Sequence, residues 1–426
     1  MQAAATREIG NLKDLVAFIR SELKPKGKIL TPFNVITAPI LAIGLGLIIY
    51  RFIFGLGTVV HEVPGFPWGI WIGFNIMSGV AFAGGAYVLT FVVYILRSEK
   101  YHPIIRPTVL NGFLAYLFYA GVIVVDCGRW WNITNPILGN KFGVNAVLFL
   151  IAWHFLLYML TELVEFSPAI AEWLGLKKVR RILNSMTIGA VIFGITLSTL
   201  HQSGLGALIM MGKPNIHPLW WTEYIPVLFF VSSIFAGLSM VIFEGSISLR
   251  VFGRQMTEEY RREYPDIVVG LAKTCAAVMF VYLFLKALVL IHGRHWDLLN
   301  TPMGYWYLTE VVGLVLIPCL MFAKGVRSRN LTIIRVAALL TMAGIIINRC
   351  NYVFIAYKWY VPLSERYIPT LAETWIAFTV VLAHIWTFRW IVNRMPVYRE
   401  VPEWAKEEEE EKIIRKEVAQ WKASRM

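Results

Sequence analysis

The chain has 426 residues, of which 57% are hydrophobic and only 16% are charged, and its mean hydropathy is +0.60. A soluble domain cannot bury this much apolar surface, so the composition excludes a soluble globular protein and indicates that lipid is the main solvent. The net charge of +13 would suggest nucleic-acid binding in a soluble protein. Here most basic residues lie between hydrophobic runs, where they indicate membrane topology instead.

The first 31 residues are polar or amphipathic and contain no short apolar run followed by a cleavage site. We therefore expect the first membrane span to be retained. Apolar residues recur at helical spacing behind Asn11, which favours a short helix on the membrane surface, although a solvated leader fits as well. These apolar residues are Leu12, Leu15, Val16, Ile19 and Leu23.

Ten apolar stretches are long enough to cross a hydrocarbon core of about 30 Å as helices. They lie near residues 35–54, 68–96, 108–128, 143–165, 182–210, 222–248, 267–291, 305–325, 331–354 and 369–393. The sequence therefore predicts an all-α, polytopic membrane protein with ten transmembrane helices.

Basic residues are concentrated in the loops that follow even-numbered spans. These loops carry Arg97, Lys100, Arg106, Lys177, Lys178, Arg180, Arg181, Arg250, Arg254, Arg261, Arg262, Lys324, Arg327 and Arg329. The loops after odd-numbered spans carry fewer, namely Arg129, Lys141, Lys213, Arg294, Lys358 and Arg366. Because loops rich in Lys and Arg stay in the cytoplasm, both termini are predicted to be cytoplasmic, including a charged, solvated tail at 396–426.

An internal repeat relates two parts of the predicted membrane domain, residues 32–395. The end of span three reads Gly-Arg-Trp-Trp-Asn at 128–132, and the end of span seven reads Gly-Arg-His-Trp-Asp at 293–297. Residues 78–84 in span two similarly resemble 232–237 in span six. Four spans separate the matching elements, so we expect two parallel four-helix bundles at about 68–210 and 222–354, flanked by spans one and ten.

The four cysteines are widely spaced and form no Cys-x-x-Cys pair. The sequence therefore offers no obvious cradle for an iron–sulfur cluster, zinc or c-type haem. Any metal clusters are expected to lie in partner proteins.

Ionisable and polar side chains inside the spans are candidates for function, because burying them in a bilayer is unfavourable unless they are paired or hydrated. His154 in span four and His201 in span five both lie roughly 15 Å from the outer side at about 1.5 Å per residue, and could face one another. An outer pocket of hydrogen-bonding groups would suit a quinone, which has two carbonyl oxygens and exchanges protons. The candidates for this pocket are Asn75, Tyr116, Tyr119, Asp126, Arg129, His154, His201 and Gln202.

A polar stripe on span four runs from His154 toward the cytoplasm through Tyr158, Glu162 and Glu165 and could carry protons. Glu244 in span six is a second candidate for proton transfer. Each of these residues also has a plain structural interpretation as a packing or interhelical hydrogen-bonding group. We interpret two further features as structural: His384 in span ten, and the charge cluster Lys286, Glu310 and Arg349.

Three motifs in register resemble the NrfD/PsrC family of integral membrane subunits, in particular its ten-span branch of HybB-like, DsrP-like and HmcC-like subunits. They are Trp-Gly-Ile-Trp-Ile-Gly-Phe-Asn at 68–75, Asp-Cys-Gly-Arg at 126–129 and Leu-His-Gln-Ser-Gly at 200–204. The resemblance covers essentially all ten spans. One departure is Trp130, which stands where the family usually has proline.

The resemblance implies a subunit without haem or iron–sulfur clusters of its own, in a prokaryotic cytoplasmic membrane. Such a subunit binds menaquinone or ubiquinone near the outer face and exchanges electrons with an extracytoplasmic ferredoxin-like iron–sulfur subunit. Other redox subunits, including a multihaem cytochrome c, are further expected partners. His201, Tyr116 and Asp126 match family positions associated with the quinone site or its proton route, and Glu244 matches a carboxylate proposed in proton transfer.

Two other functions remain open from the sequence alone. His154 and His201 at matching depth could ligate one haem, as in a b-type cytochrome. Internal repeats and polar groups near the midplane are also typical of secondary transporters. The parallel sense of the repeat and the absence of prominent Gly or Pro interruptions in matching spans argue against a transporter.

Overall fold

Ten long helices form the body of the protein. The computed structural model describes residues 12–61, 63–138, 146–399 and 402–406. The helices long and apolar enough to cross a membrane are Pro32–Phe54, Trp71–Ile95, Glu99–Asp126, Val147–Trp173, Lys177–Met210, Ile225–Phe252, Glu258–Gly293, Pro302–Ser328, Leu331–Ile355 and Leu371–Val392. The described part contains no β-strand beyond an isolated bridge. The prediction of an all-α, ten-span, multi-pass membrane protein is confirmed.

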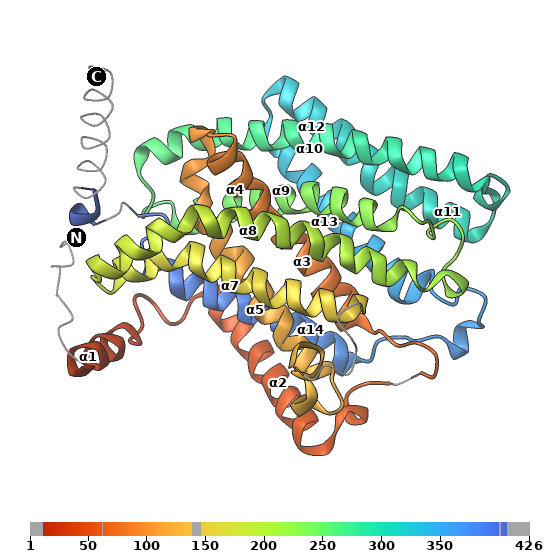
Figure 1. Ribbon diagram of the computed structural model, residues 1–426, viewed down its shortest axis with the longest axis horizontal. Coiled ribbons are helices and arrows are strands. Elements are labelled where there is room, and N and C mark those ends of the chain that lie inside the picture. Colours follow the sequence, from red (N-terminus) through yellow and green to blue (C-terminus); the bar gives the residue numbers. More distant parts are fainter. Residues whose placement is uncertain (1–11, 62, 139–145, 400–401, 407–426) are drawn as a thin grey trace, which may run out of the picture.

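The labels of Figure 1 follow the chain through these spans. The first span is α2 (Pro32–Phe54), the second contains α3 (Gly79–Ala83) and α4 (Gly85–Thr90), and the third contains α5 (Ile105–Asp126). The next four are α7 (Val147–Trp173), α8 (Lys177–Met210), α9 (Ile225–Phe252) and α10 (Glu258–Gly293). The last three contain α11 (Pro302–Leu308) with α12 (Ile317–Ser328), α13 (Leu331–Cys350), and α14 (Leu371–Val392).

Side-chain caps explain several helix starts. Thr31 accepts a hydrogen bond from the Asn34 backbone N–H at the start of α2, and Thr257 does the same for Tyr260 at the start of α10. A capping box opens α14, where the Thr370 side chain and the Glu373 side chain each bond the other residue's backbone N–H. These contacts satisfy backbone donors that have no partner within the helix.

Four π-helical segments interrupt the regular spans, and the sequence analysis did not predict them. They are Trp71–Ser78, Phe91–Ile95, Thr309–Leu316 and Asn351–Ile355. In the first, the Ser78 hydroxyl donates to the Gly73 carbonyl at 2.7 Å, five residues earlier. Each segment changes which side chains face a neighbouring helix, which is why π-turns often occur at functional positions.

Spans two to five are called the first helix group and spans six to nine the second, and α9 of the second also packs extensively on α8, α3 and α4 of the first. In the first group α5 packs on α3, α4 and α7, and α7 packs along α8. In the second group α9, α10, α12 and α13 contact in sequence and α13 returns to α9. Figure 1 shows α7 and α8 side by side, with α10 and α12 together at one edge of the molecule. The parallel-repeat relation between the two groups stays a prediction.

The two groups meet at a crossing of glycines from spans two and six. A Cβ atom on Gly237 would lie 2.0 Å from the Gly85 backbone nitrogen, so the two backbones touch. The hydroxyls of Tyr87 and Ser233 hydrogen-bond at 2.9 Å beside this crossing. The glycines belong to, or directly follow, the two segments whose sequence similarity suggested the repeat.

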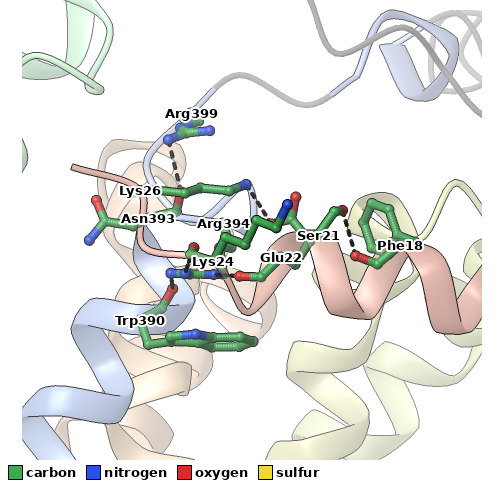
Figure 2. A network of polar contacts seen from close by, with 9 residues as sticks. All are labelled: Phe18, Ser21, Glu22, Lys24, Lys26, Trp390, Asn393, Arg394 and Arg399. Atoms are coloured by element: carbon green, nitrogen blue, oxygen red, sulfur yellow. Dashed lines mark hydrogen bonds and ion pairs between the residues drawn. The ribbon is translucent and has the colours of Figure 1, made fainter.

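The first and last spans flank the groups, with α2 against α14. Near the N-terminus, α1 (Leu12–Glu22) lies within the segment for which an interfacial helix was predicted, and its described residues Val16 and Ile19 are exposed. Figure 2 shows how the following turn is attached to the end of α14: the Arg394 guanidinium donates to the Glu22 carbonyl at 2.6 Å and to the Lys24 carbonyl at 3.0 Å. Residues 407–426 of the predicted tail lie outside the described residues.

Candidate functional site

His201 lies at the centre of a fully buried polar cluster inside the first helix group. It projects from α8 and is 0% exposed, as is the neighbouring Gln202. Aromatic rings enclose the imidazole, with ring centroids 5.7 Å away for Tyr116 of α5 and 5.3 Å for Phe155 of α7. Tyr158 of α7 packs edge-on to Tyr116 at 4.7 Å. Three neighbouring spans therefore bring these polar groups into contact.

Most polar atoms of this cluster have no hydrogen-bond partner within the described part of the chain. They are both ring nitrogens of His201, Oε1 of Gln202, the hydroxyls of Tyr116, Tyr158 and Ser198, and both carboxyl oxygens of Glu162. The Tyr116 hydroxyl lies near Ser198 and Gln202 without reaching hydrogen-bond geometry to either. Gln202 uses its Nε2 to donate to the Val80 carbonyl at 3.0 Å. Buried polar atoms without partners are rare in proteins, and they indicate a place where water or a polar ligand binds.

The carboxyl groups of α7 continue from this cluster along the helix. Glu162 is 1% exposed and lies near the Tyr158 hydroxyl. Gly112 of α5 leaves room for its carboxyl, since a Cβ there would be 2.3 Å from Glu162 Oε1. Glu165, nearly one turn further, packs against Gly194 of α8 in the same way, at 3.2 Å. Tyr116, Tyr158, Glu162 and Glu165 thus form a line of polar groups toward the predicted cytoplasmic side.

A buried ion-pair network lies beyond Glu165, near the C-terminal end of α7. The Glu172 carboxylate accepts from Arg106 at 2.7 and 2.9 Å and from Arg180 at 2.7 Å. Arg106 also donates to the Pro396 carbonyl at 2.9 Å. The sequence analysis used these two arginines only as topology markers, and it did not anticipate that Glu172 joins three segments.

Two of the predicted pocket residues, Tyr119 and Asn75, lie away from the His201 imidazole, whereas His154 is near enough to interact with it electrostatically. Tyr119 packs against Gly79 and the His384 ring, whose centroid is 6.1 Å away. Asn75 donates to the Ala377 carbonyl of α14 at 3.0 Å and keeps its Oδ1 without a partner. His154 is half-buried one turn from Tyr158 on α7, and its Nδ1 has no partner.

Asp126 and Arg129 lie at and just beyond the C-terminal end of α5 rather than beside His201. Asp126 ends the helix and interacts electrostatically with Arg51 of α2. Arg51 is 2% exposed and donates to the carbonyls of Val125, at 2.6 Å, and Cys127. Arg129 is exposed. These residues hold α2 to the end of α5.

Glu244 of α9 lies near the opposite end of its span. Its Oε1 accepts from the Ser248 hydroxyl at 2.5 Å and from the Tyr398 hydroxyl at 2.9 Å. Tyr398 follows α14, so the segment before the tail covers this carboxyl group. Glu244 belongs to the second helix group and is separate from the His201 cluster.

The second group has its own buried polar cluster, in which the side chains hydrogen-bond to one another. Both Glu310 oxygens accept: Oε1 from Asn348 at 2.7 Å, and Oε2 from Trp220 at 2.7 Å and Asn351 at 2.5 Å. Arg349 donates to Asn348 Oδ1 and to the Ser232 hydroxyl, each at 2.7 Å. Asn348 therefore bridges Glu310 and Arg349. Lys286, the third charge of the predicted cluster, lies over the rings of Tyr307 and Tyr282, with its Nζ 5.3 and 5.8 Å from their centroids.

The fold and the buried polar clusters define a multi-pass helical membrane protein with functional candidates inside the bilayer. Within that class the chain belongs to the NrfD family: the family model described as polysulphide reductase, NrfD, matches residues 58–360. The matched region contains eight of the ten spans, the second to the ninth, and all predicted site residues.

Two relatives extend the similarity over nearly the whole chain. A protein of Nitratidesulfovibrio vulgaris strain Hildenborough is 38% identical over 376 residues, which cover 88% of this chain and 97% of the relative. A protein of Escherichia coli K12, named probable Ni/Fe-hydrogenase 2 b-type cytochrome subunit, is 30% identical over 376 residues, covering 87% of this chain and 93% of the relative.

Proposed function

We propose that this chain is the quinone-binding membrane subunit of a respiratory redox complex. It exchanges electrons between the menaquinone or ubiquinone pool and an extracytoplasmic, ferredoxin-like iron–sulfur subunit. Membership of the NrfD family and similarity to a subunit named after hydrogenase 2 support a role within a larger redox assembly. Other redox subunits, among them a multihaem cytochrome c, are further candidates for partners.

The observation that carries this proposal is the set of unpartnered polar atoms around His201. A quinone ring needs hydrogen-bond donors at its two carbonyl oxygens, within an otherwise apolar site. The imidazole of His201, the Gln202 amide and the Tyr116 hydroxyl are polar groups of this kind, and they are enclosed by aromatic rings. The residues present therefore fit a quinone head group in their chemistry.

A bound quinone supplies the electron-transfer chemistry, since it takes up or releases two electrons together with two protons. The chain's own residues bind and move protons. We assign His201 and Tyr116 to proton exchange at the ring, and Gln202 to orientation. His154 belongs to the surrounding shell of the pocket, whereas Asn75 and Tyr119 face α14. Asp126 and Arg129 act at the outer mouth.

The carboxyl groups of α7 form the proposed proton route. Tyr158, Glu162 and Glu165 follow His201 in order along adjacent turns, at a spacing that water molecules can bridge. Glu244 is a second proton-exchanging carboxyl near the cytoplasmic end of α9. We also propose that segments 1–31 and 396–426 lie in the cytoplasm and that residues 32–395 form the membrane domain, as the distribution of basic residues predicts.

The decisive test is the substitution His201→Ala in the complete complex. We expect quinol-dependent reduction of the partner to fall by a factor of about 100 or more, because general acid–base groups contribute on the order of 10²–10⁴. His292→Ala is the matched control, since that histidine is exposed and remote from the cluster. Assembly, measured by co-purification of the partner subunits, should be unchanged in both variants. Retained turnover in His201→Ala would refute the assignment.

A b-type cytochrome is the second candidate, and the printed name of the Escherichia coli relative favours it. Haem would need His154 and His201 on opposite sides of the iron. The rings of Phe155 and Tyr116 pack directly against the His201 imidazole, at centroid distances of 5.3 and 5.7 Å, so a haem ligated by His201 would have to displace them. A Soret band in the purified subunit that disappears in His201→Ala would favour the cytochrome over the quinone proposal.

A further inference from the structure

A separate cavity of about 460 Å³ lies on the other side of α5 from the His201 cluster. Residues of α2, α5, α9, α13, α14 and span two line it. Its volume falls within the roughly 300–1,000 Å³ of typical small-molecule sites. The lining is predominantly apolar, with Phe82, Met240, Phe243, Met342, Ile346 and Val381 as examples. Glu244, Ser248 and Arg389 also line it, but these three are hydrogen-bonded to other residues.

Three polar side chains line this cavity without a hydrogen bond to any described residue. They are Asn111 and Tyr119 of α5 and His384 of α14, which are only 8%, 7% and 6% exposed. Asn111 and Tyr119 lie two turns apart on one face of α5, and His384 stands opposite. The His384 ring stacks on Phe118 at 6.0 Å with an interplanar angle of 7°, so packing fixes its orientation. Unbonded polar groups on two opposite sides of an apolar chamber indicate a polar ligand.

The cavity also has an apolar rim that faces the lipid. Ile247 and Val251 of α9 and Ile385 of α14 line the cavity and are 47%, 55% and 38% exposed. Exposed apolar residues on transmembrane helices face hydrocarbon. A ligand dissolved in the bilayer can therefore enter sideways between α9 and α14.

We infer that this cavity is a second quinone site, with the ring between Tyr119, Asn111 and His384 and the isoprenoid tail leaving between α9 and α14. A phospholipid would keep its polar head at the membrane surface and offer these groups only an acyl chain. A quinone instead carries two carbonyl acceptors into the middle of the bilayer on an apolar molecule. The choice of quinone as ligand rests on the proposed function, whereas the site itself rests on the cavity and its unbonded groups.

The test is photolabelling of the purified complex with an azido derivative of a short-chain menaquinone, followed by mass spectrometry of the labelled peptides. We expect label on α14 and α5 around the cavity. Excess unlabelled menaquinone should suppress that label, and added phospholipid should not. Suppression by phospholipid alone would overturn the inference.

Two variants separate this site from the His201 cluster. Ile346→Trp fills the cavity and should abolish its label, while Ile192→Trp, on an exposed face of α8, is the matched control and should not. His384→Phe preserves the stacking on Phe118 but removes a hydrogen-bonding group. The probe concentration needed for half-saturation of the label should rise on the order of tenfold, the effect of about one hydrogen bond. Cavity label that persists in both variants would refute the second site.

The labelling pattern also distinguishes the two proposals. His201→Ala should leave the cavity label unchanged and remove label at the His201 cluster. Label at the His201 cluster alone would refute the second site and leave the proposed function standing. Label in the cavity alone would support the second site and refute the placement of quinone at His201.

Discussion

The two helix groups each bury a cluster of polar side chains in the same membrane, but only one cluster is hydrogen-bonded. Glu310 and Arg349 in the second group are joined through Asn348, and among the atoms of that trio only Arg349 Nε lacks a partner. Around His201 most polar atoms lack one. Because an unbonded polar atom in a bilayer is unfavourable, a fold that retains several is suited to bind something there. Burial and charge alone would not distinguish the two clusters as candidates for a functional site.

The strongest test of the difference between the two clusters is to remove the Glu310 carboxylate. Glu310→Ala leaves the buried donors of Trp220, Asn348 and Asn351 without their acceptor. We expect a destabilisation of about 3–5 kcal/mol, the usual effect of breaking a buried charged network. The shift in unfolding temperature, monitored by size-exclusion chromatography of heated samples, measures this destabilisation. An unchanged unfolding temperature would mean that the second cluster is not structural.

The corresponding change in the first group is Glu162→Gln, which should affect activity and not stability. The Glu162 oxygens make no hydrogen bond that the substitution would break. Loss of its exchangeable proton should lower quinol-dependent turnover by about 10–100-fold. Glu165→Gln tests the next position of the same route. Full turnover in both variants would remove the carboxyl groups of α7 from the proton route.

A histidine outside the membrane spans provides a test by pH. Burial lowers the pKa of His217 to about 4, with nearby His295 contributing, and its Nδ1 accepts a hydrogen bond from the Leu219 N–H at 3.2 Å. Since the folded state binds the proton less readily than the unfolded chain, stability is complete above pH 6.5 and falls as the pH drops toward 4. His217→Asn keeps an acceptor for Leu219 and should flatten this part of the profile. An identical profile in the variant would contradict the assignment.

The smallest expected effect is that of Tyr116→Phe on stability. The Tyr116 hydroxyl has no hydrogen bond to lose, so the unfolding free energy should change by less than about 0.5 kcal/mol. Tyr398→Phe is the contrasting variant, because it removes a 2.9 Å bond to Glu244 and should destabilise by about 1 kcal/mol. A larger loss for Tyr116→Phe would indicate that its hydroxyl is structurally engaged.

The number and position of the spans could be predicted because hydrophobic length is a property of each segment alone. The partners of each side chain could not. Tyr116 and Tyr119 lie three residues apart on α5, yet one faces His201 and the other His384. On a helix that is buried on two sides, residues three positions apart can face different neighbouring helices. The spacing of apolar residues does not show which neighbour each one faces. The same reason explains why Tyr119 was assigned to the His201 pocket and not to the cavity that it lines with His384.

The crossing of Gly85 and Gly237 has a mechanical consequence. Where two backbones touch directly, no layer of side chains remains that could shear or change rotamer. The two helix groups cannot slide past each other at this point without collision.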